Sequence, residues 1–165
     1  VEAAEPVCQG EGQCDDQTVD RRDFGDDAWA SAQVIFVDSN VVLDLVTNDP
    51  QWADWSEQQL ETAAARDRLA INGVVYAELS MAFARVEHLD AELKEMDLAL
   101  LDIPRAALFL AGVAFKQHRA RKGPRTSILP DFFVGAHAAV LRAPLITRDV
   151  ARYKTNFPGL KLIAP

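Results

Sequence analysis

Residues 34–46 read VIFVDSNVVLDLV, and this stretch decides the fold. Its first four residues form an apolar run of the length of a buried strand, and the residues after Asp38 continue as a short amphipathic segment. A buried strand that leads directly into a helix is typical of βαβ units in a parallel sheet. The stretch therefore predicts an α/β protein in which Asp38 follows the first strand.

The same alternation of short apolar runs and longer amphipathic segments continues to the end of the chain. It predicts an α/β/α sandwich, a Rossmann-like parallel sheet of about five strands flanked by helices. Strands are expected at residues 34–37, 69–72, 98–102, 144–147 and 160–163. Helices are expected at residues 40–46, 52–66, 74–87, 90–96, 104–121 and 130–142, and in a short segment after Asp149.

Composition separates an acidic N-terminal segment from a nearly neutral domain. Residues 1–33 hold nine acidic residues against two arginines, whereas residues 34–165 hold sixteen acidic and fifteen basic residues. The first segment has few large apolar side chains and cannot offset its ordering entropy, so we expect disorder there and one domain at residues 34–165. The low pI of 4.8 mostly reflects that segment and does not exclude a nucleic-acid partner.

Cysteine usage and hydropathy bear on the compartment. Cys8 and Cys14 both lie in the acidic segment, so the domain has no cysteine for a disulfide framework or a thiolate metal site. No stretch approaches the roughly 18 apolar residues of a membrane span, and no signal peptide pattern begins the sequence. We expect a cytoplasmic protein with no membrane association.

Four carboxylates lie at the edges of apolar runs: Asp38 in IFVDSN, Glu78 in VVYAELS, Asp131 in ILPDFF and Asp149 in LITRD. Asp38 and Asp149 follow their strands at the sheet edge where parallel sheets bind ligands, and all four can meet there. Burying an ionised carboxylate is costly unless a positive charge compensates it. A cluster of carboxylates without His or Cys favours a hard divalent cation such as Mg²⁺.

Taken singly, each aspartate has a simpler explanation. Asp38, Asp131 and Asp149 stand where helices are expected to begin, and a carboxylate there caps backbone N–H groups. Ser39, Asn40 and Thr147 flank these acids and either support them through hydrogen bonds or serve as ordinary caps.

Helix capping does not explain Glu78. In the helix expected at residues 74–87, Glu78 shares an apolar stripe that extends to Val86. The alternative to a metal ligand is a buried ion pair with Arg85 or Arg148. Three further acids at the same edge favour the metal.

The remaining candidates are weaker. Asp44 is interpreted as solvated or salt-bridged, His88 and His118 as surface residues, and His137 as a hydrogen-bonded core histidine. The histidines do not suit a zinc site.

A basic run, KQHRARKGPR, occupies residues 116–125 just upstream of Asp131. Its simplest interpretation is a solvated helix end. Its cations would also hold a polyanion that four carboxylates repel. The candidate RNA-binding residues are Lys116, Arg119, Arg121, Lys122 and Arg125.

The stretches FVDSNVVLDL, INGVVYAELS, ILPDFFVGAHA and LITRDVARYKTNFPGLKLI resemble the motifs of PIN domains, specifically of VapC-type toxin ribonucleases. The resemblance covers essentially all of residues 34–165. It implies an α/β/α sandwich, a Mg²⁺ or Mn²⁺ site, endonucleolytic cleavage of RNA (tRNA, rRNA or mRNA) and a homodimer. It also implies a cognate VapB-type antitoxin, whose arginines approach the acidic pocket in this family.

The resemblance places the metal-binding and catalytic acids at Asp38, Glu78, Asp131 and Asp149, with Thr147 as a supporting residue. Many relatives carry a further acid shortly after the third, whereas this chain has the apolar sequence FFV after Asp131. The number of metal ions is therefore open.

Two other functions compete with the toxin ribonuclease. IFVDSNVV resembles the first strand of haloacid-dehalogenase phosphatases, but Asn40 stands where their general acid belongs. The second alternative is a catalytically silent binding module, in which the acids only accept arginines from a partner protein. Metal-dependent RNA cleavage would exclude pure binding.

Overall fold

The structure is a computed structural model that describes residues 33–121 and 129–165. The expected disordered segment, with its two cysteines, lies outside these residues apart from Gln33. The centre is a five-stranded parallel sheet of order β3-β2-β1-β4-β5. Its strands are β1 (Val34–Val37), β2 (Arg68–Asn72), β3 (Leu98–Leu101), β4 (Leu145–Ile146) and β5 (Leu162–Ile163).

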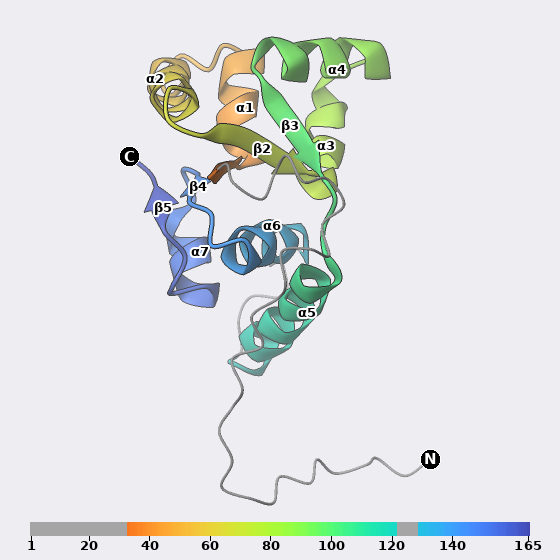
Figure 1. The fold of residues 1–165 in the computed structure, drawn as a ribbon, viewed down its shortest axis with the longest axis vertical. Coiled ribbons are helices and arrows are strands. Elements are labelled where there is room, and N and C mark those ends of the chain that lie inside the picture. The colour runs from red at the N-terminus through yellow and green to blue at the C-terminus, as the bar shows by residue number, and fades with distance from the viewer. Residues whose placement is uncertain (1–32, 122–128) are drawn as a thin grey trace, which may run out of the picture.

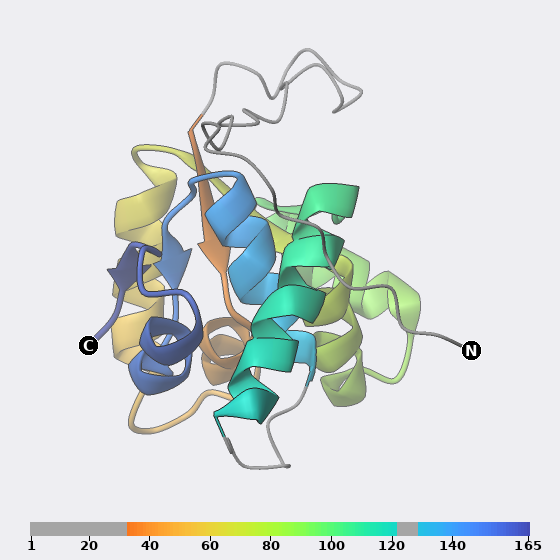
Figure 2. The same cartoon turned by 90° about the horizontal axis from the view of Figure 1, so that it is seen from below.

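Helices cover both faces of this sheet (Figures 1 and 2). One face carries α1 (Ser39–Val46), α2 (Ala53–Ala64), α3 (Gly73–Leu79) and α4 (Val86–Glu95). The other carries α5 (Arg105–Ala120), α6 (Leu129–Val140) and α7 (Val150–Asn156). Right-handed crossovers explain the division, because the path from β1 to β3 steps one way across the sheet and the path from β3 to β5 steps back. The predicted α/β/α sandwich is confirmed.

The prediction of a single helix at residues 74–87 is wrong, because the chain forms two helices there. After α3 comes a 3₁₀ turn, η3 (Ser80–Ala82), and then Phe83 with extended backbone angles. The Ser80 hydroxyl donates to the Ala77 carbonyl oxygen at 2.7 Å, a local hydrogen bond that competes with helix continuation. Val86 consequently begins α4 with 57% of its surface exposed, and it is not on one stripe with Glu78.

The strand pair β1–β4 fixes the position of the site. The two strands are far apart in sequence, yet Val37 pairs with Ile146 in parallel register. The strand order reverses at this pair, and such a reversal opens a crevice beyond the carboxyl ends of the strands. Asp38 and Thr147 are the next residues of the two strands, so the fold brings them together at this crevice.

No helix within the described residues is long and apolar enough to cross a membrane.

Candidate active site

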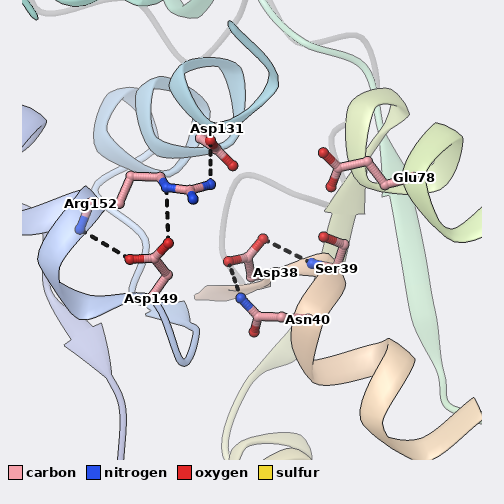
Figure 3. A pocket seen from close by; sticks show the side chains of 7 residues that line it. All are labelled: Asp38, Ser39, Asn40, Glu78, Asp131, Asp149 and Arg152. Carbon is pink, nitrogen blue, oxygen red and sulfur yellow. Dashed lines mark hydrogen bonds and ion pairs between the residues drawn. The ribbon is translucent and has the colours of Figure 1, made fainter. Parts of the chain in front are cut away.

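A cavity of about 300 Å³ lies at the carboxyl edge of the sheet (Figure 3). All four predicted carboxylates line it, and each comes from a different part of the fold: the start of α1, α3, α6 and the start of α7. In Figure 3, Asp38 lies between Glu78 on one side and the pair of Asp149 and Arg152 on the other. The lining residues are Asp38, Ser39, Asn40, Glu78, Asp131, Asp149 and Arg152.

Asp38 is the buried centre of this group, with 5% of its surface exposed. Its Oδ1 accepts the Ser39 backbone N–H at 2.9 Å, as expected of a residue that caps α1. Its Oδ2 accepts the Asn40 side-chain amide at 2.8 Å and the Thr147 hydroxyl at 2.6 Å. Capping and site formation are therefore combined in one carboxylate, and the predicted supporting residues donate to it.

The protonation of Asp38 reflects this burial. Burial raises the pKa of Asp38 to about 6, although the hydrogen bonds from Thr147 and Ser39 lower it. The charges of Asp131 and Glu78 raise the pKa further. A carboxyl group held in this way gains strongly from a nearby cation, because the cation stabilises the ionised form.

A hydrogen-bond network fixes the loop between β4 and α7 against α1. The Arg148 backbone N–H donates to Asn40 Oδ1 at 3.2 Å, and the Asp149 backbone N–H donates to Thr147 Oγ1 at 3.0 Å. Asn40 thus binds both Asp38 and the loop. The relative position of Asp38 and Asp149 follows from these contacts.

Arg152 is a site residue that the sequence analysis missed. Its Nη1 lies 2.5 Å from Asp131 Oδ2, and its Nε lies 2.9 Å from Asp149 Oδ2. The guanidinium therefore bridges carboxylates from α6 and α7 (Figure 3). The spacing of three residues from Asp149 was a signal for one of these pairs, since residues i and i+3 of a helix are neighbours. Nothing in the sequence indicated the pair with Asp131.

One guanidinium does not neutralise the cavity. Burial raises the pKa of Asp131 and outweighs the lowering by Arg152, and Asp149 adds to the rise. Burial lowers the pKa of Arg152, but the charges of Asp131 and Asp149 reverse this and raise it. Among the described residues that line it, the cavity holds four carboxylates against one guanidinium.

The chemistry of these side chains fits a hard divalent ion, because every donor is an oxygen and the charge is negative. The carboxylate side chains are not arranged around a common ion position, however. Among residues 33–121 and 129–165, no three Asp, Glu, His or Cys side chains are close enough together to hold a metal ion. Two of the four acids, Asp131 and Asp149, are paired with Arg152.

Glu78 does not form either ion pair that was considered for it. Arg85 pairs with Glu87 at 3.1 Å, and Arg148 pairs with Asp44 at 2.8 Å. Glu78 is half-buried instead and lines the cavity from α3. This placement is what the metal-ligand prediction requires of it.

Asp44 is salt-bridged as predicted, but it is buried rather than solvated, with 2% of its surface exposed. It accepts from Arg148 and also from the Ser56 hydroxyl at 2.7 Å. The Arg148 guanidinium lies over the Trp52 ring, 5.1 Å from its centroid. The ion pair between Asp44 and Arg148 connects α1 to the loop after β4.

The histidines differ from one another. His88 is exposed as predicted, whereas the surface prediction for His118 is wrong. The His118 ring packs against Phe132 with its Nδ1 3.1 Å from Asn156 Oδ1, because α5 lies against α6 and α7. His137 is a core residue as predicted, and burial lowers its pKa to about 4. The hydrogen bond predicted for it is not found at Nδ1, which is buried and has no partner among the described residues.

The basic run does not line the cavity where it is described. Lys116 and Arg119 are exposed on α5, and Arg121 follows the helix. Lys122 and Arg125 lie outside the described residues. Of the basic side chains that the structure describes, Arg152 alone lines the cavity.

The fold and site together define a class, the α/β proteins with an acidic cavity at the switch point of a parallel sheet. The model of the PIN domain family matches residues 35–157, and the chain belongs to this family.

Solved structures share this fold. A chain of the DNA-bound VapBC2 complex from Rickettsia felis is 20% identical over 80% of this chain and 98% of its own, with a TM-score of 0.64. A chain of VapBC-1 from nontypeable Haemophilus influenzae has the same identity and coverages and a TM-score of 0.60. A chain of DNA-bound VapBC from Salmonella typhimurium is 17% identical, with coverages of 81% and 98% and a TM-score of 0.60. No curated protein matches the chain.

Proposed function

We propose that this PIN domain protein is a metal-dependent endoribonuclease of the VapC type, the toxin of a type II toxin–antitoxin module. It would cleave RNA phosphodiesters and thereby inhibit translation and growth. One observation carries the proposal: four carboxylates from four parts of the fold line one cavity, and burial holds the central one, Asp38, at a raised pKa. Such a site is suited to a divalent cation.

Mg²⁺ or Mn²⁺ would be held by Asp38 and Asp131 as principal ligands, with Glu78 and Asp149 completing the site directly or through water. When bound, the ion supplies an activated water and neutralises charge on the phosphate. The protein orients the central ligand, because Asn40 and Thr147 donate to the same Asp38 oxygen and favour its ionised form.

The RNA would be bound partly by cations outside the cavity. Lys116 and Arg119 are exposed on α5, and in the sequence the basic run ends six residues before Asp131. Cations there offset the repulsion between the carboxylates and the RNA backbone. Single strands and loops are the expected targets, since their phosphates and bases are accessible.

A VapB-type antitoxin and a second copy of the chain are the proposed partners. The similar structures are VapBC complexes, which supports the first. Exposed apolar residues on α5, including Phe109 and Val113 at a spacing of four, support a protein partner on that helix.

The silent binding module stays as a second candidate because one arginine already pairs with two of the acids. A dehalogenase-type phosphatase is disfavoured by Asn40, because an amide cannot act as the general acid that those enzymes have at this position.

The test is incubation of purified, antitoxin-free protein with total cellular RNA and Mg²⁺ or Mn²⁺, followed by mapping of new RNA ends. Asp38→Asn and an EDTA sample are the negative controls, and Asp54→Asn, at an exposed position on α2, is the matched substitution. Discrete cuts with wild type and Asp54→Asn alone support the nuclease. Binding of RNA or antitoxin without cuts supports the silent module.

A further inference from the structure

Arg152 is distinguished from the other described arginines by its surroundings. Its guanidinium lines the acidic cavity and bridges two carboxylates that belong to different helices. We infer that Arg152 holds Asp131 and Asp149 in place of a divalent ion, and that it binds a backbone phosphate of the RNA once an ion takes these carboxylates. This inference rests on the proposed function.

The bridge occupies one carboxylate oxygen of each of the two aspartates. Arg152 contacts Oδ2 of Asp131 and Oδ2 of Asp149. A carboxylate oxygen that accepts a charge-assisted hydrogen bond is a poorer metal ligand, and the positive charges of arginine and ion repel each other at this distance. Arginine and ion therefore compete for the same two acids.

Arg152 can change partners without any change in the fold. Its backbone N–H is fixed, because it donates to Asp149 Oδ1 at 3.1 Å and so begins α7. Its side chain is 44% exposed, so rotation about the side-chain bonds can move the guanidinium while the helix stays in place. Asp149 holds the backbone with one oxygen and the guanidinium with the other.

A guanidinium released from the two acids remains beside the cavity. Its planar set of N–H donors matches two oxygens of a phosphodiester, which is the group that the proposed reaction brings to this place. None of the acids can make that contact, because each would repel the phosphate. Arg152 is thus the phosphate-binding residue that the carboxylate cluster otherwise lacks among the described residues.

Two other arginines show what this residue would look like in a structural role. Arg85 pairs with Glu87 at 3.1 Å on the surface, where both side chains are mostly exposed. Arg148 pairs with the buried Asp44 and packs on Trp52, and it does not line the cavity. Arg85 is therefore a matched control for loss of an arginine–carboxylate pair outside the cavity.

The first experiment measures Mn²⁺ binding by calorimetry in the absence of RNA, with wild type, Arg152→Gln and Arg85→Gln. We expect Arg152→Gln to bind Mn²⁺ about fivefold more tightly, because a partly exposed competing ion pair is lost. We expect a larger rise in melting temperature on Mn²⁺ addition as well. Arg85→Gln should match wild type. Unchanged or weaker Mn²⁺ binding by folded Arg152→Gln would overturn the competition.

The second experiment measures binding of a labelled single-stranded oligoribonucleotide by fluorescence anisotropy at saturating Mn²⁺. We expect Arg152→Gln to bind about tenfold more weakly, since a charge-assisted contact is lost. Tighter ion binding with weaker RNA binding is a pair of effects that misfolding cannot produce. Equal RNA affinity for Arg152→Gln and wild type would overturn the phosphate contact. RNA binding that follows this pattern with no cleavage by wild type would reject the nuclease and keep the role of Arg152.

Discussion

Two aspartates at either end of α1 are both buried, yet their surroundings are opposite. Asp44 is 2% exposed and has its own cation, since Arg148 lies 2.8 Å away and the Ser56 hydroxyl donates to its other oxygen. Asp38 is 5% exposed and has three hydrogen-bond donors, but its charged neighbours include Asp131 and Glu78.

The difference separates a structural acid from a functional one. A buried carboxylate that is paired with a guanidinium and a hydroxyl has its charge compensated. Removing that carboxylate destabilises the fold. A buried carboxylate beside like charges has no compensating cation in the fold. A bound metal ion would stabilise its ionised form.

The largest expected effect is the loss of cleavage in Asp38→Asn. The rate should fall by about a thousandfold or more, because a ligand of the proposed ion is removed. The free energy of unfolding in EDTA should be unchanged or higher, because repulsion from Asp131 and Glu78 is relieved. RNA cleavage assays and urea denaturation measure the two effects. A destabilised variant with normal cleavage would make Asp38 a structural acid.

Asp44→Asn should show the reverse behaviour. Its free energy of unfolding should fall by about 2–3 kcal/mol, because Arg148 loses its carboxylate while only partly exposed. Mn²⁺ binding by the folded variant should stay close to that of wild type. Urea denaturation and calorimetry test this, with Asp54→Asn as the exposed control. Loss of Mn²⁺ binding at full stability would remove the distinction between the two acids.

The pH dependence of stability should differ between wild type and Asp38→Asn in EDTA. The pKa of Asp38 is about 6 in the folded protein against an ordinary 3.8, so between these values the folded state binds a proton that the unfolded chain lacks. Its contribution to stability is therefore present at low pH and lost as pH rises through 6. It amounts to at most about 3 kcal/mol.

The measurement is the difference in unfolding free energy between Asp38→Asn and wild type from pH 4 to 7. The difference should increase in favour of the variant as pH rises. The wild-type curve alone is less informative, because His137 contributes with the opposite sign: its lowered pKa of about 4 favours folding as pH rises toward 6.5. A difference that does not vary with pH would show that the pKa of Asp38 is not raised.

Thr147→Val should have the smallest effect. The hydroxyl of Thr147 donates a 2.6 Å hydrogen bond that lowers the pKa of Asp38, and the substitution removes this bond. We expect Mn²⁺ to bind about tenfold more weakly, because a group that orients a ligand is lost. Thr47→Val is the control, since the Thr47 hydroxyl donates to the Leu43 carbonyl away from the cavity. Equal Mn²⁺ affinity in both variants would show that Thr147 does not tune Asp38.

The sheet and most helices could be predicted because local patterns determine them. Short apolar runs such as VIFV must be buried, and each predicted strand matches an observed one to within two residues at either end. The predicted convergence of four acids on one cavity followed from the topology, since strand ends in a parallel sheet share an edge. The break after α3 was missed because the apolar spacing in the sequence continues through it to Val86.

Side-chain pairs between distant segments could not be predicted from local patterns. Asp44 and Arg148 are 104 residues apart, and Asp131 and Arg152 are 21 apart. Each pair depends on how two helices or loops pack against each other. His118 was misplaced for the same reason, because charged neighbours in sequence hid its packing against Phe132.

The most direct test compares the rise in melting temperature on Mn²⁺ addition for wild type, Asp38→Asn and Asp44→Asn, without RNA. An ion that binds the folded state alone raises its melting temperature. We predict a rise for wild type and for Asp44→Asn, although the latter starts from a lower value, and no rise for Asp38→Asn. Equal rises for Asp38→Asn and wild type would contradict the claim that the uncompensated carboxylate at the start of α1 is the centre of a metal site.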